Sequence, residues 1–141
     1  MIQYARAASR SPFTSVWQAA SLLGAAGPDV YHLIQDGSLP LAFNIARPGG
    51  ARACVRVATA AVLALKRGKF PPSGLQPFLA SLLPDSRFSY SVPQLAFMLQ
   101  CDPDHIYHLI AHKQFEDVGG PTRYRVPRRS IAGFLTSRQL S

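Results

Sequence analysis

Three histidines and a cysteine in the second half of the chain have a spacing that could support chemistry. Cys101, His105, His108 and His112 are separated by four, three and four positions. The histidines therefore share one face if this segment is helical, and residues four apart on a helix can hold one metal ion together. Cys101 precedes the turn that we expect before this helix. We therefore predict no metal and no cofactor, and interpret the histidines as an outward polar stripe.

Cations gather just beyond these histidines. The basic residues and the aromatic residue between them are Lys113, Arg123, Tyr124, Arg125, Arg128 and Arg129. In an extended segment, Arg123 and Arg125 leave the same side of the strand and can contact phosphates together. Arg128 and Arg129 stand at the expected start of a helix, where a cation is unfavourable unless a polyanion is near. The segment therefore predicts a site for a polyanion.

The overall charge favours the same kind of partner. The chain has 141 residues, with 15 Lys and Arg against 7 Asp and Glu, which gives a net charge of +8. Such a charge suits nucleic acid or a membrane surface. No uncharged apolar run approaches the length of a membrane span, and the N-terminus lacks a signal-peptide pattern. We expect a cytoplasmic, nucleoid-associated protein with no membrane partner.

No constellation typical of an enzyme is present in a suitable context. Paired carboxylates, a nucleophile beside a base and a glycine-rich phosphate loop are all missing from the sequence pattern. These are the arrangements that acid–base, covalent and phosphate chemistry require. We therefore predict that the protein is not an enzyme.

An internal repeat organises the elements that must position these residues. Tyr31-His32-Leu33-Ile34 returns as Tyr107-His108-Leu109-Ile110. Further pairs match at the same offset: Val16 and Val92, Gln18 and Gln94, Ala20 and Ala96, and Leu23 and Leu99. A repeat of this length predicts two copies of one small domain. We expect a flexible basic arm at 1–13, a first copy at 14–69, a linker at 70–89 and a second copy at 90–141.

The first copy is predicted from its caps, turns and periodicity. We expect helices at 16–23 and 28–35, hairpin strands at 39–45 and 52–57, and a helix at 58–66. Trp17 and Tyr31 are expected in the core, whereas Asp29 and Asp36 face outward. In the linker, a helix from about Leu75 to Leu83 has an apolar stripe. This stripe is either a clamp between the copies or a dimerisation surface.

The second copy is predicted to repeat this plan. A helix capped by Ser91 is followed by a turn, a helix at 104–112 capped by Asp102, strands at 115–118 and 123–126, and a last helix opened by Pro127. Tyr107 is expected in the core with a hydrogen-bonded hydroxyl. The two strands and the turn between them would form a wing.

Four strings in the second copy carry a resemblance to a known family. They are Tyr90-Ser91-Val92-Pro93-Gln94-Leu95-Ala96, the stretch from Asp102 to Ile110, Arg123-Tyr124-Arg125-Val126-Pro127-Arg128-Arg129-Ser130-Ile131, and Phe134-Leu135. Residues 90–135 thereby resemble the excisionase-like, MerR-type winged helix-turn-helix family. Together with the internal repeat, the resemblance implies a mostly α fold with small β-hairpin wings, arranged as two tandem winged helix-turn-helix domains joined by a proline-bounded helical linker.

The resemblance also implies a function. Helix 104–112 would read the major groove of double-stranded DNA, and wing 119–126 would contact the backbone or the minor groove. The protein would act as a transcription regulator or as an excisionase-like architectural factor in DNA recombination. The alternative is a phage- or plasmid-associated interaction or assembly module whose winged helices do not read DNA.

The first copy is predicted to play a different part. Asp29 and Asp36 stand where the second copy has His105 and His112, so the equivalent surface is acidic and repels phosphate. This copy is expected mainly to pack or to bind a partner protein, such as a recombinase or a polymerase. Secondary DNA contacts remain open for its cations, which are Arg47, Arg52, Arg56, Lys66, Arg67 and Lys69. Two DNA half-sites could be met by both copies of one chain or by a homodimer.

Overall fold

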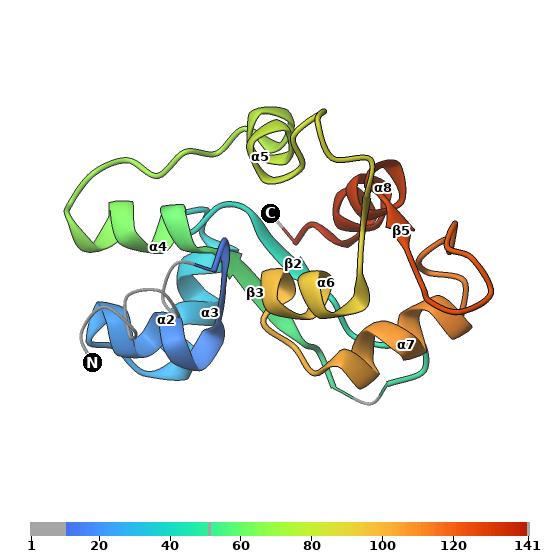
Figure 1. Ribbon diagram of the computed structural model, residues 1–141. Helices are drawn as coiled ribbons and strands as arrows, with labels where there is room; N and C mark the ends of the chain where they lie inside the picture. The colour runs from blue at the N-terminus through green and yellow to red at the C-terminus, as the bar shows by residue number, and fades with distance from the viewer. Residues whose placement is uncertain (1–10, 51, 141) are drawn as a thin grey trace, which may run out of the picture.

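The protein combines helices with small antiparallel sheets, as the computed structural model in Figure 1 shows. The structure describes residues 11–50 and 52–140. Most of the predicted arm, residues 1–10, lies outside the described residues. Ser11 and Phe13 are buried, so the packed structure begins before the predicted boundary at residue 14.

The first segment forms one sheet and three helices. Its elements are β1 (Phe13–Ser15), α2 (Val16–Leu23), α3 (Gly27–Gln35), β2 (Ala42–Asn44), β3 (Val55–Ala58) and α4 (Thr59–Lys66). The strand order is β1-β3-β2, and both pairs are antiparallel. The three predicted helices and the hairpin of β2 and β3 are confirmed. β1 was not predicted, because three residues carry too short a pattern to reveal a strand that pairs with Ala58.

The second segment has the same order of helices. A linking helix, α5 (Leu75–Leu82), leads to β4 (Ser89–Tyr90), α6 (Val92–Leu99), α7 (Pro103–Ala111), β5 (Val126–Pro127) and α8 (Arg128–Arg138). β4 and β5 pair antiparallel, with Tyr90 opposite Val126. The first helix of each segment begins in the same way. Ser15 and Ser91 cap α2 and α6, each with a glutamine three residues later that completes a capping box.

The predicted wing of the second segment is wrong in its secondary structure. No strand forms at 115–118, and Val126 pairs with β4 instead of completing a hairpin. One hydrogen bond of the kind expected between the two strands remains, from Val118 N–H to the Arg125 carbonyl oxygen at 2.8 Å. The reason is that the Asp117 side chain accepts hydrogen bonds from the backbone N–H groups of Gly119 and Arg125. These bonds fold the segment into a compact loop.

Both segments contribute to one hydrophobic core. Phe78 of α5 packs against Phe13 and Phe43 of the first segment, with ring centroids 5.6 and 6.0 Å apart. At the other end of this helix, the Leu83 carbonyl accepts a hydrogen bond from Arg128 of the second segment. These contacts favour the clamp over the dimerisation surface as the interpretation of the linker helix.

Three aromatic residues that we expected in the core lie at the surface. Trp17 is 78% exposed, Tyr31 is 42% exposed and Tyr107 is 43% exposed. The inward positions of their helices are occupied by smaller apolar residues, such as Val30 on α3 and Ile106 on α7, both fully buried. The prediction failed because an aromatic residue next to an inward position points about 100° away from it, a consequence of 3.6 residues per turn.

Candidate nucleic-acid interface

The exposed face of α7 carries two of the three predicted histidines. This helix lies at the lower edge of the molecule in Figure 1, away from α5 at the upper edge. Asp102 caps it by accepting a hydrogen bond from Asp104 N–H, and Pro103 occupies its first turn. His108 and His112 are exposed, and their ring centroids lie 6.2 Å apart. His112 Nδ1 lies 2.8 Å from the His108 carbonyl oxygen, so its other ring nitrogen is the one that faces solvent.

His105 does not belong to this exposed stripe, contrary to the sequence prediction. It is half-buried, and its Nε2 lies 2.6 Å from the carbonyl oxygen of Ile45 in the first segment. A carbonyl oxygen can only accept a hydrogen bond, so Nε2 of His105 is the donor. His105 therefore fixes the start of α7 to the hairpin connection between β2 and β3.

The loop after α7 places an arginine and a tyrosine beside the helix. Tyr124 meets Tyr107 of α7 edge to face, with ring centroids 5.3 Å apart. Arg123 is exposed next to it, and Lys113 is exposed at the start of the loop. A Cβ added at Gly119 would lie 2.2 Å from the Arg123 carbonyl oxygen. Only glycine therefore permits this close crossing of the loop on itself.

Arg125 does not share a face with Arg123, so the predicted pair of guanidinium groups is not formed. Arg125 is half-buried, and its Nε and Nη2 donate to the side chain and the carbonyl of Ser89 at 3.1 and 3.0 Å. The alternation rule failed because no regular strand forms here. Ser89 was not singled out in the sequence, since its role depends on the pairing of β4 with β5.

The arginines that open α8 already have carboxylate partners. Arg128 contacts Asp85 at 2.8 Å and donates to the Leu83 carbonyl at 2.6 Å. Arg129 forms an ion pair with Glu116. These partners offset the unfavourable position of a cation at a helix start. The argument that Arg128 and Arg129 require a polyanion is therefore wrong, although Arg129 remains largely exposed.

The predicted secondary contacts divide into three groups. Arg56 is half-buried and donates to the Leu99 and Gln100 carbonyls at 2.8 and 2.7 Å, so it links the segments. Arg47 and Arg52 are exposed on the hairpin connection that follows Ile45, beside the start of α7. The remaining cations, Lys66, Arg67 and Lys69, are exposed at the end of α4. Figure 1 shows α4 and α7 on different sides of the molecule.

The equivalent face of α3 keeps the acidic character expected from the sequence. Asp29 and Asp36 are exposed, and Asp29 accepts a hydrogen bond from Ala26 N–H at the helix start. Hydrogen bonds from the side chain and backbone of Ser38 lower the pKa of the Asp36 carboxyl group. Asp36 is therefore negatively charged at neutral pH, and this face opposes the approach of phosphate.

Cys101 and the histidines do not assemble into a metal site. Among the described residues, no group of three or more His, Cys, Asp or Glu is placed to hold a metal ion. Cys101 follows the C-cap of α6, and burial raises the pKa of its thiol to about 11. The thiol is protonated at neutral pH, which is the form least suited to bind metal.

Comparisons with models of protein families, with curated proteins and with solved structures find no match for this chain. Across the described part of the chain, no helix is long and apolar enough to cross a membrane.

Proposed function

We propose that the protein binds double-stranded DNA through the α7 surface, which we define as His108, His112, Lys113, Arg123 and Tyr124. The observation that supports this proposal most is the contact between Tyr107 and Tyr124. It holds a loop with an exposed arginine against a helix whose outward side chains are polar. A helix beside a cationic loop is the arrangement with which winged helix-turn-helix proteins enter the major groove.

The residues of the α7 surface suit phosphate contacts better than base reading. Among the described residues, the charged side chains of Lys113 and Arg123 have no hydrogen-bonded or ion-paired partner. The two imidazoles can each donate or accept one hydrogen bond at a base edge, but they lack the two-pronged geometry of Arg or Asn. We infer that binding has modest sequence preference, as suits a transcription regulator or an architectural factor of the excisionase type acting at the nucleoid.

The test is the salt dependence of DNA affinity. Fluorescence anisotropy of a labelled random-sequence duplex is measured between about 50 and about 200 mM salt for the wild type and for Lys113→Ala/Arg123→Ala. Each lost phosphate contact reduces the slope of log K against log salt by about 0.9. The double variant should therefore bind more weakly, with a slope smaller by about 2.

The matched control removes two cations from the other side of the molecule, as Lys66→Ala/Lys69→Ala. This control variant keeps the net charge of the test variant. If the two double variants lose affinity equally, binding depends on net charge and not on the α7 surface. If the wild type does not bind duplex DNA at about 50 mM salt, the proposed function is wrong.

A second candidate function, an interaction or assembly module, is favoured by the aromatic surface of the first segment. Trp17 is 78% exposed and lies together with Pro28 and Tyr31 around a depression between α2 and α3. Large exposed aromatic side chains are enriched at protein interfaces. We infer that this surface contacts a protein partner, such as a recombinase or a polymerase, while α7 faces DNA.

A further inference from the structure

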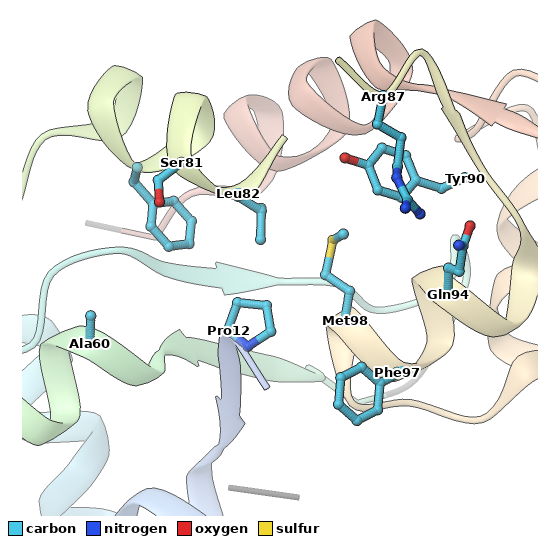
Figure 2. Close-up of a pocket in the computed structure, with 10 residues that line it drawn as sticks. Pro12, Ala60, Ser81, Leu82, Arg87, Tyr90, Gln94, Phe97 and Met98 are labelled. Atoms are coloured by element: carbon cyan, nitrogen blue, oxygen red, sulfur yellow. The ribbon is translucent and has the colours of Figure 1, made fainter. Parts of the chain in front are cut away.

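A pocket of about 490 Å³ lies between α5 and α6, where the two segments meet. Its walls are largely apolar and include Pro12, Phe78, Leu82, Phe97 and Met98. Figure 2 shows that these and the other lining residues come from four places: the residue before β1, α4, α5 and the stretch from Arg87 to α6. A mostly apolar pocket of this size at the junction of two segments is typical of a small-molecule site.

Tyr90 is the buried polar residue of the pocket whose side chain lacks a hydrogen-bond partner. It is 4% exposed, and its hydroxyl is, among the described residues, the one buried side-chain polar atom without a hydrogen-bond partner. A buried hydroxyl without a partner is unfavourable, because it has lost its hydrogen bonds to water. In Figure 2 this hydroxyl projects from the side of the ring that faces Leu82. The arrangement therefore favours a ligand group that accepts a hydrogen bond from Tyr90.

The charge at the pocket suggests the sign of that group. The guanidinium carbon of Arg87 lies 5.4 Å from the centroid of the Tyr90 ring. Arg87 is exposed and is the charged residue in the lining, which contains no Asp or Glu. Burial raises the pKa of Tyr90, so its hydroxyl remains a donor at neutral pH. An anionic ligand group would therefore meet both a hydrogen-bond donor, Tyr90, and a cation, Arg87. A cationic ligand would lie near Arg87 with no carboxylate in the lining to offset the repulsion.

We propose that this pocket binds a small amphipathic carboxylate, with an aromatic or medium-length aliphatic body among the apolar residues. Its carboxylate accepts a hydrogen bond from the Tyr90 hydroxyl and faces the Arg87 guanidinium group. The site is separate from the α7 surface and does not depend on DNA binding. Because the lining joins both segments through α5, a bound ligand stabilises their packing.

The test uses two carboxylate probes, decanoate and 2-naphthoate, with decylamine as the matched cationic control. Binding to the full chain is measured by isothermal titration calorimetry and by ligand-detected NMR. At least one carboxylate should bind with a Kd below about 1 mM, and decylamine should bind at least tenfold more weakly. The proposal is wrong if neither carboxylate binds, or if decylamine binds as well as decanoate.

Variants assign the binding to this pocket. Tyr90→Phe removes the hydroxyl while keeping the ring, and it should weaken carboxylate binding about tenfold through one lost charge-assisted hydrogen bond. Ser81→Trp places a large ring in the pocket from an exposed position on α5 and should abolish binding. Ala80→Trp is the matched control, because Ala80 is exposed on the same helix but outside the lining.

The variants also separate this pocket from an adventitious apolar surface. If Ser81→Trp and Ala80→Trp bind decanoate with equal affinity, the ligand lies elsewhere and the proposal is wrong. If Tyr90→Phe and Arg87→Gln both leave the affinity for the carboxylate unchanged, the proposed recognition of the carboxylate by Tyr90 and Arg87 is wrong. Thermal unfolding of each variant without ligand shows that the comparison is made between folded proteins.

Discussion

At the scale of single residues, four arginines act as links between distant parts of the chain. Arg56, Arg125, Arg128 and Arg138 each donate to backbone carbonyl groups between 36 and 94 positions away in the sequence. Guanidinium groups suit this role because several N–H donors lie in one plane. A substantial part of the net charge of +8 is therefore committed to internal contacts.

Arg56 provides the clearest test of this structural role. Arg56→Ala removes the hydrogen bonds to the Leu99 and Gln100 carbonyls and leaves both half-buried acceptors without their donor. We expect a loss of about 2–3 kcal/mol in the free energy of unfolding, measured by urea denaturation. Arg52→Ala, at an exposed position on the same hairpin, should change it by less than about 0.5 kcal/mol. Equal losses in the two variants would contradict the linking role.

Cys101 makes the stability depend on pH at the alkaline end. Desolvation raises the pKa of its thiol from 9.0 to about 11, so the folded state holds the thiol proton more tightly than the unfolded state. Its contribution to stability is complete below about pH 9 and is lost as the pH rises through about 11. In a Cys54→Ser variant, alkylation by iodoacetamide at about pH 8 should be about a hundredfold slower in the folded than in the urea-unfolded protein. Equal rates, followed by mass spectrometry, would show that the thiol is not shielded.

At the scale of elements, the loop between α7 and β5 decides whether Arg123 and Tyr124 lie beside the helix. In a Gly119→Ala variant, the added Cβ would meet the Arg123 carbonyl oxygen at 2.2 Å and the Arg125 nitrogen at 2.8 Å, so the loop must open. We expect DNA affinity, measured by anisotropy at about 50 mM salt, to fall at least as far as in Arg123→Ala.

The neighbouring glycine supplies the control for this experiment. A Cβ at Gly120 meets nothing within 4 Å, so Gly120→Ala should leave both the loop and the affinity unchanged. The Gly119→Ala variant must have the circular dichroism spectrum of the folded protein. If its DNA affinity then equals that of the wild type, the loop takes no part in binding.

Local signals predicted the helices well. Ser15 and Ser91 mark helix starts through capping boxes whose pattern is visible in the sequence. The elements that were missed or misplaced depend on distant partners. β1 forms only because Phe13 pairs with Ala58, and the second wing is replaced by a loop that the Asp117 side chain closes.

The candidate site was predicted in part for the same reason. His108, His112, Lys113, Arg123 and Tyr124 are exposed on or beside α7 as expected. The prediction placed His105 and Arg125 with them. A single sequence shows the periodicity of a helix or strand but does not show which other element of the fold packs against its face. The Ile45 carbonyl and Ser89 occupy these two side chains, and both come from other elements.

At the scale of the whole molecule, the shared core implies that the two segments fold as one unit. α5 packs on the aromatic residues of the first sheet and is bound by Arg128 of the second segment. A chain of about 50 residues that loses such contacts has too little buried apolar surface for stability. A fragment covering residues 86–141 should therefore have the circular dichroism spectrum of an unfolded chain. The full chain should unfold in one cooperative transition. A fragment that folds alone would contradict a shared core.

DNA bound to the α7 surface would cover one of the chain's lysines and leave the others free, which a lysine footprint can measure. The chain has three lysines, Lys113 on the α7 surface and Lys66 and Lys69 at the end of α4. Acetylation of each lysine is followed by mass spectrometry with and without a random-sequence duplex at about 50 mM salt. We expect DNA to protect Lys113 while Lys66 and Lys69 react as before. Protection of Lys66 and Lys69 with Lys113 unaffected would show that DNA does not bind at the α7 surface.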